Sequence, residues 1–382
     1  MRFDTIPGHQ PIKQFFSKMI RENRVPHAML FVGGEGYGKL GLALSLTMLL
    51  QCKDRSEGSA CGECSSCKKI LSHLHPDVHF AFPVIKKDKL TRKETTSQHF
   101  LAEWREFLQN NPFGDINDWL LHLDAIDKSP NINVAECSQI FKNLGLMTFE
   151  GEYKVQIIWY AELLGKEGNR LLKLIEEPSD NTIIILITHN RAQILNTLKS
   201  RCQIINVPPV DDASLKEYIT SQYDLSDEDT DELTFLSAGN IRKANMLGKQ
   251  NELNYSEDLM DWLRVAYACD PEKVVNYTQE MVSMGKQEML HFLNYGCHFF
   301  REYLLYLNTQ DTDKLRLTEK EKEVAVKMTK IIDINKTQEI SEVLAKMSSY
   351  IRRNLALKSL VMQITLEINA ILRAEVNNLV AR

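Results

Sequence analysis

Residues 32–41, with the sequence VGGEGYGKLG, retain most of a loop that binds nucleotide phosphates. In the pattern GxxxxGK[ST], backbone N–H groups surround the phosphates, a lysine contacts them, and a hydroxyl binds the accompanying Mg²⁺ ion. Gly33, Gly38 and Lys39 occupy the required positions, but Leu40 replaces the hydroxyl residue. The sequence therefore predicts the architecture of a phosphate loop without one of its metal ligands.

A second group of chemically capable residues is a run of cysteines in a loop rich in Gly and Ser. Its members are Cys52, Cys61, Cys64 and Cys67. Four thiolates from one short loop match the tetrahedral coordination of structural Zn²⁺, whereas a redox pair needs only two cysteines. We therefore predict a zinc site, with a redox pair or surface thiols as the alternatives. Three histidines follow closely and could each replace one ligand: His73, His75 and His79.

The third observation concerns residues that are missing. A P-loop protein that hydrolyses nucleotide has acidic residues at the end of a neighbouring strand, where they bind Mg²⁺ and polarise the attacking water. The apolar segment KVQIIWYAELL (154–164) instead has Trp159 and Tyr160 at that point. Glu162 follows two residues later, where we expect a helical turn to direct it elsewhere. We therefore expect no intrinsic ATPase activity, and Trp159 and Tyr160 are predicted to fill the space of the metal.

Alternating apolar runs and helical patterns surround these residues. Strands are predicted at HAMLFVG (27–33), 154–160 and 181–188, and helices after Lys39 and at GNRLLKLIEEPS, which ends at Pro178. Strands that alternate with helices indicate an α/β fold with a parallel sheet covered on both faces. The phosphate loop then lies between a strand and a helix, as its chemistry requires.

After residues 206–210, NVPPV, the pattern contains helices only. Gly239 and Asn240 mark a turn into a helix, which closes a small helical unit near residue 250. Amphipathic helices fill residues 256–382. The sequence therefore predicts an α/β domain, a small helical unit and a larger all-helical domain.

Composition limits the functional classes. The chain has 382 residues, of which 43% are hydrophobic and 25% charged, and its net charge is −5. This charge argues against general coating of nucleic acid, and we find no basic face with interspersed aromatic residues, so an independent zinc-dependent nucleic-acid binder is disfavoured. The first residues contain no apolar leader, and no apolar run reaches the ~18 residues of a membrane span. We therefore expect a cytoplasmic protein with reduced cysteines.

Taken together, the motifs resemble a known family. In chain order they are GGEGYGKLGLA (33–43), the cysteine run, HPD (75–77), LLKLIEEP (171–178) and LKSRCQ (198–203). This series closely resembles the delta prime family of bacterial DNA polymerase III clamp-loader subunits, over residues 1 to about 250. The resemblance implies an AAA+ P-loop domain at 1–208 with a zinc module at 52–67. A small helical lid domain at 209–252 and a helical collar domain at 253–382 follow.

The resemblance also implies a function. Clamp loaders open the ring-shaped sliding clamp and place it on primed DNA, and the delta prime subunit is related to the ATP-using subunits without being a motor. The implied partners are the gamma/tau ATPase subunits, the delta subunit, the clamp and primed DNA, with no membrane. The alternative is an active ATP-hydrolysing motor subunit. Whether the altered phosphate loop retains ATP stays open.

Two arginines acquire candidate roles from this family. Arg201, flanked by Ser200 and Cys202, corresponds to a finger that enters the ATP site of a neighbouring subunit, a role that suits a permanently charged, bidentate guanidinium. The alternative is a surface arginine that caps a helix. Arg242 in GNIRKA resembles a nucleotide-sensing arginine of the lid, with a structural salt bridge as its alternative.

One segment departs from the family pattern. Residues 86–130 are longer than expected between HPD and the next shared stretch, and we call them the insertion. Its large apolar side chains predict packed helices rather than a binding face. They are Trp104, Phe107, Trp119 and Leu120.

Overall fold

The computed structural model divides the chain into two compact units, Met1–Lys249 and Gln250–Arg382. It describes residues 1–56, 58–87, 90–91, 93–126, 128–145, 147–248, 255–352 and 356–374. The predicted boundary between residues 252 and 253 lies outside these described residues, as do parts of the insertion.

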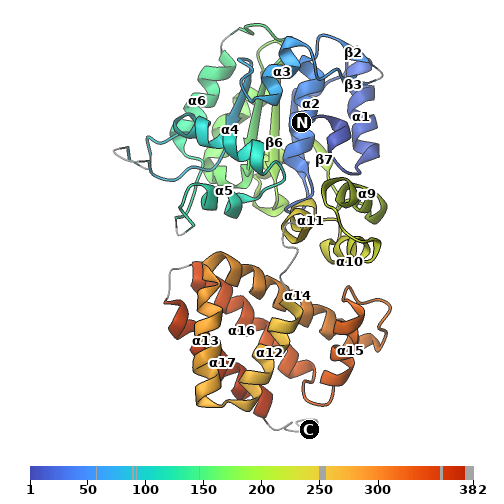
Figure 1. Cartoon of the computed structure of the whole chain (residues 1–382). Helices are drawn as coiled ribbons and strands as arrows, with labels where there is room; N and C mark the ends of the chain where they lie inside the picture. The colour runs from blue at the N-terminus through green and yellow to red at the C-terminus, as the bar shows by residue number, and fades with distance from the viewer. Residues whose placement is uncertain are drawn as a thin grey trace, which may run out of the picture. The chain divides into compact units, whose positions relative to one another are not determined.

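A parallel sheet forms the centre of the first unit (Figure 1). Among the described residues it has five strands in the order β4-β5-β6-β1-β7. Their bounds are Val78–Ala81 (β4), Lys154–Trp159 (β5), Thr182–Thr188 (β6), Ala28–Val32 (β1) and Gln203–Asn206 (β7). Neighbouring strands pair in parallel, with Leu30 opposite Leu186 and Ile158 opposite the same residue. The predicted α/β class and the three predicted strands are confirmed.

The two faces of the sheet contribute to different cores because side chains alternate along each strand. Met29 and Phe31 of β1 belong to the core on one face, while Ala28 and Leu30 belong to the core on the other. Both faces are covered, which explains why β6, TIIILIT, is an uninterrupted apolar run buried along its whole length.

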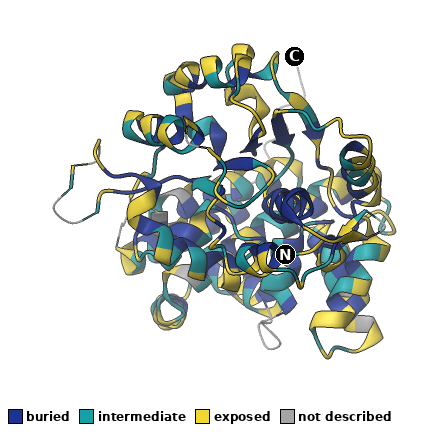
Figure 2. Ribbon diagram, turned by 90° about the horizontal axis from the view of Figure 1, so that it is seen from above, coloured by how far each residue is buried: buried dark blue, intermediate teal, exposed yellow. Residues whose placement is uncertain are grey.

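Helices cover both faces. The core that contains Met29 and Phe31 includes α1 (Gln10–Arg21), α2 (Lys39–Gln51), α3 (Ser65–Leu71), α4 (Leu101–Asn110) and α5 (Ile116–His122). The opposite core includes α6 (Val134–Gly145), η3 (Ala161–Leu171), α7 (Leu172–Glu176) and α8 (Asn196–Lys199). Helix α2 is apolar and buried on every side, as Figure 2 shows in dark blue. The helix after the phosphate loop is therefore anchored in the core.

Short elements complete the α/β part. They are η1 (Phe3–Thr5), the hairpin β2 (Arg55–Ser56) and β3 (Ser59–Ala60), η2 (Ser97–Phe100) and η4 (Arg191–Gln193). Helix α7 ends at Glu176, which confirms that the predicted helix stops before Pro178.

The insertion packs as predicted. Trp104, Phe107, Trp119 and Leu120 are all buried. The Trp104 ring stacks on Phe82 with centroids 4.2 Å apart and lies 5.0 Å from the ring of Trp159. Trp159 therefore packs into the aromatic core of the insertion.

Three helices follow the sheet and form what we call the three-helix segment (212–248). They are α9 (Asp212–Gln222), α10 (Asp227–Ser237) and α11 (Ile241–Gly248). Gly239 has φ of +75°, and a Cβ atom there would lie 2.5 Å from the carbonyl oxygen of Val210. Only glycine tolerates both conditions, so the predicted turn into α11 has a physical reason.

The second unit is helical throughout its described residues. Its helices are α12 (Tyr255–Ala268), α13 (Pro271–Ser283), α14 (Gly285–Thr309), α15 (Glu319–Met328), α16 (Ile334–Arg352) and α17 (Leu357–Arg373). Their apolar faces share one core, in which the buried Trp262 donates its indole N–H to Thr365 at 2.9 Å. Within the described part of the chain, no helix is both long enough and apolar enough to cross a membrane.

Candidate functional site

The four predicted zinc ligands converge. Their sulfur atoms all lie within 4.8 Å of one another, with 3.5 Å between Cys52 and Cys61 and 3.9 Å between Cys61 and Cys67. Tetrahedral Zn²⁺ with Zn–S bonds of ~2.3 Å requires sulfur separations of about 3.8 Å. The residues therefore fit a structural zinc ion. The three nearby histidines do not belong to the cluster.

Backbone geometry holds the thiols in this arrangement. The N–H groups of Cys61, Cys64 and Cys67 each donate to the sulfur of the preceding cysteine at 3.3–3.4 Å. Burial opposes ionisation of Cys64, but N–H groups of Lys53 and Cys67 lower its pKa to about 6, whereas burial raises the pKa of Cys67. A metal would remove the thiol protons, because the ligand form of cysteine is the thiolate.

The HPD residues support the cysteine loop. The N–H of Asp77 donates to Nδ1 of His75 at 3.2 Å, so Nε2 carries the ring proton and donates to Ser66 at 2.8 Å. Ser66 lies on α3 between two of the cysteines. The Asp77 carboxylate accepts the N–H groups of Phe149, Glu150 and Gly151. His75 and Asp77 therefore position the cysteine helix and segment 149–151, and neither is required as a metal ligand.

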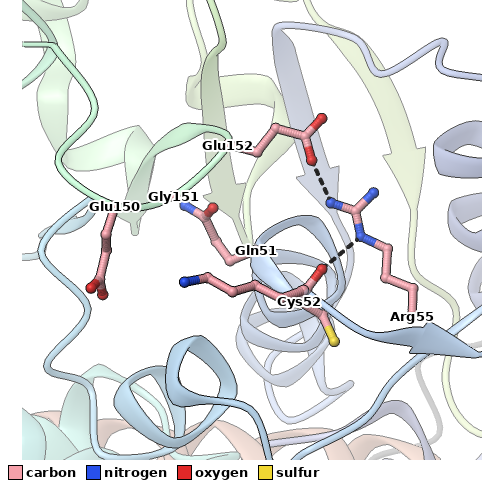
Figure 3. A pocket seen from close by; sticks show the side chains of 7 residues that line it. Gln51, Cys52, Arg55, Glu150, Gly151 and Glu152 are labelled. Atoms are coloured by element: carbon pink, nitrogen blue, oxygen red, sulfur yellow. Dashed lines mark hydrogen bonds and ion pairs between the residues drawn. The ribbon is translucent and has the colours of Figure 1, made fainter.

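A polar pocket of about 410 Å³ lies beside the cysteine loop (Figure 3). Its lining consists of Gln51, Cys52, Lys53, Arg55, Glu150, Gly151 and Glu152. Arg55 donates to Glu152 at 2.6 Å and to the carbonyl oxygen of Cys52 at 3.1 Å. Glu150 pairs with Lys69 of α3 at 2.5 Å. These ion pairs connect the cysteine loop and α3 to residues 150–152.

The phosphate loop has the predicted position between β1 and α2. Lys39 is 97% buried, and its ammonium donates to the carbonyl oxygens of Gly33 at 2.8 Å and of Gly34. Burial lowers the pKa of Lys39 to about 7, although the negative charges of Glu162 and Glu35 raise it. The lysine therefore binds its own loop. Leu40 is buried in the apolar core.

Tyr160 closes the strand end that should carry metal ligands. Its backbone is left-handed, with φ of +57°, and its hydroxyl donates to Glu35 of the phosphate loop at 3.0 Å. The ring stacks on His189 with centroids 4.0 Å apart. Tyr160 thus lies where a metal-binding carboxylate would face the loop.

The expectation that Glu162 is directed elsewhere is wrong. Its carboxylate is almost fully buried, accepts the N–H of His189 at 3.0 Å and lies 3.6 Å from Nδ1 of the same residue. Burial opposes ionisation, but the nearby imidazole and the backbone N–H of His189 lower the pKa of Glu162. The negative charge of Glu162 raises the pKa of Lys39, and this effect is larger than the effect of Glu35. Glu162 lies in the first turn of η3, which follows the left-handed residue Tyr160.

Arg242 forms the salt bridge that the sequence offered as the alternative. Its Nε and Nη2 atoms donate to the two carboxylate oxygens of Asp118 at 2.5 and 2.7 Å. Asp115 lies 3.4 Å from Nε. These carboxylates raise the pKa of Arg242 despite its burial. Both aspartates belong to the insertion.

Arg201 lies at the start of the loop between α8 and β7. Its Nε donates to Glu176 at 2.6 Å, and Nη1 donates to the carbonyl oxygen of Thr197 at 3.1 Å and to Ser200 at 3.3 Å. The side chain stays 38% exposed. Ser200 therefore contacts the arginine that it flanks. Burial raises the pKa of Cys202 to about 11, which is typical of a structural thiol.

Sequence reasoning missed several residues of this site: Glu35, Asp115, Asp118 and His189. A local signal existed for the aspartates, because Asp115 and Asp118 form the D-x-x-D capping pattern at the start of α5. Nothing local indicates that this cap also faces an arginine of α11.

Comparisons with known proteins agree with this arrangement. A family model described as DNA polymerase III, delta subunit, matches residues 8–211. A DNA polymerase III subunit delta' from Bacillus subtilis is 30% identical over 206 residues, covering 53% of this chain and 48% of that protein. The corresponding subunit from Pseudomonas aeruginosa is 28% identical over 226 residues, covering 59% and 56%. The chain thus spans about half the length of these relatives.

A tau subunit matches as well. DNA polymerase III subunit tau from Bacillus subtilis is 26% identical over 203 residues, covering 53% of this chain and 28% of that protein. The family model extends over more than half of the chain, from before the phosphate loop to the beginning of the three-helix segment. The chain therefore belongs to the delta prime family of DNA polymerase III clamp-loader subunits.

Proposed function

We propose that the chain is a non-hydrolysing subunit of the clamp loader and supplies Arg201 to the ATP site of a neighbouring subunit. The observation that carries the first part is the state of the phosphate loop. Lys39 donates to the carbonyl oxygens of Gly33 and Gly34, where a phosphate-binding lysine would face a nucleotide. A bound triphosphate would have to displace both bonds.

The electrostatics of the loop support the same proposal. Glu35, Glu162 and Asp115 are all near the basic groups of this site, and a triphosphate would add several negative charges to it. No hydroxyl stands at Leu40 and no carboxylate at Trp159 or Tyr160 to bring in a neutralising Mg²⁺ ion. The positions Gly33, Gly38 and Lys39 then keep the shape of the loop without its chemistry.

The second part rests on the environment of Arg201. The Nε and Nη2 atoms of the guanidinium contact Glu176, Nη1 donates to Ser200, and the side chain stays accessible to solvent. An arginine finger has to combine these properties, because it must be oriented and still able to contact phosphate oxygens of a partner. In this proposal Arg201 acts in trans, and Ser200 positions it.

The remaining domains have assembly roles in the proposal. The zinc module at 52–67 stabilises the α/β part, the helices of 209–252 form the lid, and the helices of 253–382 form a collar with sister subunits. The partners are the gamma/tau ATPase subunits and the delta subunit. Through them the chain helps to load the sliding clamp on primed DNA.

The experiment that tests the proposal compares the chain alone with a reconstituted loader that contains the ATPase and delta subunits. ATP hydrolysis should be absent from the chain alone, and clamp-dependent hydrolysis should require the chain in the assembly. Hydrolysis by the chain alone that Lys39→Ala abolishes would instead support the alternative, an active motor subunit.

A further inference from the structure

The insertion presents two fixed carboxylates beside the phosphate loop. Asp115 caps helix α5 and accepts the N–H groups of Asn117 and Asp118 at 2.8 and 3.0 Å. Asp118 in turn accepts the N–H of Asp115 at 2.9 Å. This reciprocal cap fixes both side chains at the start of the helix. Asp115 is almost fully buried, so its charge needs a partner close by.

Arg242 is that partner. Its guanidinium meets Asp118 edge to edge through two hydrogen bonds, and Asp115 lies 3.4 Å from Nε. This is the bidentate geometry with which arginine binds a carboxylate or a phosphate group. The pair of aspartates therefore offers Arg242 the oxygen atoms and the negative charge that a nucleotide phosphate would offer.

The same part of the insertion also contacts the end of β5 and helix α9. We call the region where the phosphate loop, the insertion and the three-helix segment meet the joint. The N–H of Ile116 donates to the hydroxyl of Tyr160 at 3.0 Å, and that hydroxyl donates to Glu35. The Phe113 ring packs edge-on against Tyr218 of α9, with centroids 6.1 Å apart. Residues 113–118 thus touch the strand end and two helices of the three-helix segment.

Direct bonds between the phosphate loop and α11 complete the joint. The N–H of Ile241 donates to the carbonyl oxygen of Gly36 at 2.9 Å, and the side chain of Asn240 donates to the carbonyl oxygen of Glu35 at 3.0 Å. The loop, the insertion and the three-helix segment are therefore connected without a ligand.

We propose that Asp115 and Asp118 act as a built-in substitute for a nucleotide phosphate: they bind Arg242 and hold the three-helix segment against the phosphate loop. This deepens the proposed function, because a subunit whose joint is closed by its own carboxylates keeps one conformation whatever the nucleotide. The insertion then has a specific role in this joint beyond adding an aromatic core.

The test uses the full chain and amide hydrogen exchange, and it does not depend on assembly or on Arg201. Four proteins form a double-mutant cycle: wild type, Asp118→Ala, Arg242→Ala and the double variant. Asp118→Asn is added because it keeps an acceptor for the helix cap. Asp124→Asn is the matched control, since Asp124 is an exposed aspartate of the same insertion and its left-handed backbone suits asparagine.

In Asp118→Ala, amide hydrogens of residues 33–38 and 240–248 should exchange at least about tenfold faster than in the wild type. A change of this size corresponds to the loss of a charge-assisted hydrogen-bonded pair. The sheet should exchange as before. In the Arg242→Ala background, removal of Asp118 should add little, because its partner is already gone. Asp124→Asn should match the wild type, and ATP with Mg²⁺ should not slow exchange in the wild-type joint.

Three results would overturn the inference. Asp118→Ala could leave exchange in the joint unchanged, or it could act equally strongly with and without Arg242, which would mean that Asp118 serves only the helix cap. Protection of the wild-type joint by ATP would show that the site still depends on nucleotide. These readouts use the isolated chain, so they can contradict the inference about Asp115 and Asp118 while Arg201 still proves to be a finger. Equally, the inference can hold if Arg201 proves not to be a finger.

Discussion

The hydroxyl of Tyr160 donates a hydrogen bond to the carboxylate of Glu35 at 3.0 Å, which joins the end of β5 to the phosphate loop. Burial raises the pKa of Tyr160 well above its usual value, so the phenol is neutral at physiological pH. A neutral phenol cannot replace a metal-binding carboxylate. The end of β5 is therefore joined to the phosphate loop through a neutral side chain.

The first prediction is that the purified chain hydrolyses no ATP above background, with or without Mg²⁺ and primed DNA. Neither Leu40 nor the end of β5 supplies a group that would hold a metal or orient water. Phosphate release is the measurement, and Lys39→Ala is the control, which should give the same background. Turnover that disappears in Lys39→Ala would contradict the prediction.

The second prediction concerns the cysteine cluster. Elemental analysis should find one Zn²⁺ per chain, and Cys61→Ser or Cys64→Ser should release it. Zinc contributes roughly 10–16 kcal/mol to the folding of small zinc modules, so residues 52–67 should exchange amide hydrogens much faster in these variants. The sheet has its own core and should stay folded.

Cys269→Ser is the matched control for the zinc experiment, because Cys269 lies in the second unit and outside the cluster. It should keep the full zinc content. A wild-type chain that contains no metal and whose stability does not change in the Cys61 and Cys64 variants would refute the zinc site.

The sequence predicted those parts of the molecule that depend on local pattern. Uninterrupted apolar runs such as 182–188 are typical of buried parallel strands, and the spacing of the four cysteines predicted that their sulfur atoms converge. The residue types Gly239 and Asn240 predict a turn, and the structure gives the reason, since Gly239 has a conformation that excludes other residues.

The contacts between distant segments could not be predicted in this way. Asp118 looks like an ordinary capping residue until the fold brings Arg242 to it. A helical turn predicted that Glu162 points away, but Tyr160 before it is left-handed, which is rare for a residue other than glycine and has no local signal in the sequence. Trp159 packs against Trp104 of the insertion, a contact that its own segment does not indicate. In each case the partner is far away in the sequence.

The third prediction concerns pH. Glu136 is buried and its carboxylate accepts two hydrogen bonds from Ser97, at 2.6 Å from the N–H and 2.5 Å from the hydroxyl. Burial raises the pKa of Glu136 from 4.5 to about 7, although these hydrogen bonds lower it. Between those two pH values the folded chain binds more protons than the unfolded chain. The contribution of Glu136 to the free energy of unfolding therefore falls as pH rises through this window.

Glu136→Gln should remove this dependence. The free energy of unfolding of the variant should exceed that of the wild type by up to about 3 kcal/mol at pH 8 and by almost nothing at pH 4.5. Urea unfolding at several pH values measures the difference. Glu177→Gln, at an exposed position, is the control. A difference between Glu136→Gln and wild type that is the same at all pH values would show that burial does not raise this pKa.

The fourth prediction separates two adjacent glutamates. Glu176 binds the Arg201 guanidinium, whereas Glu177 is an exposed neighbour of the same charge. If Glu176 orients the finger, Glu176→Gln should lower ATP hydrolysis by a reconstituted loader by about fivefold at most, since an exposed ion pair contributes about 1 kcal/mol or less. Glu177→Gln should leave hydrolysis unchanged. Equal effects of the two substitutions would exclude this role of Glu176.

The central claim is that this chain contributes to catalysis in a neighbouring subunit through Arg201. The most direct measurement is single-turnover ATP hydrolysis by a loader reconstituted with Arg201→Ala, together with an assembly assay and clamp loading on primed DNA. Arginine fingers accelerate hydrolysis about 10³–10⁵-fold, so one ATP site should become inactive while the others continue. Arg201→Lys should rescue poorly, because an ammonium cannot bridge two phosphate oxygens. Normal assembly with the loss of one site is the predicted result, and full clamp loading by the Ala variant at limiting ATP would contradict the claim.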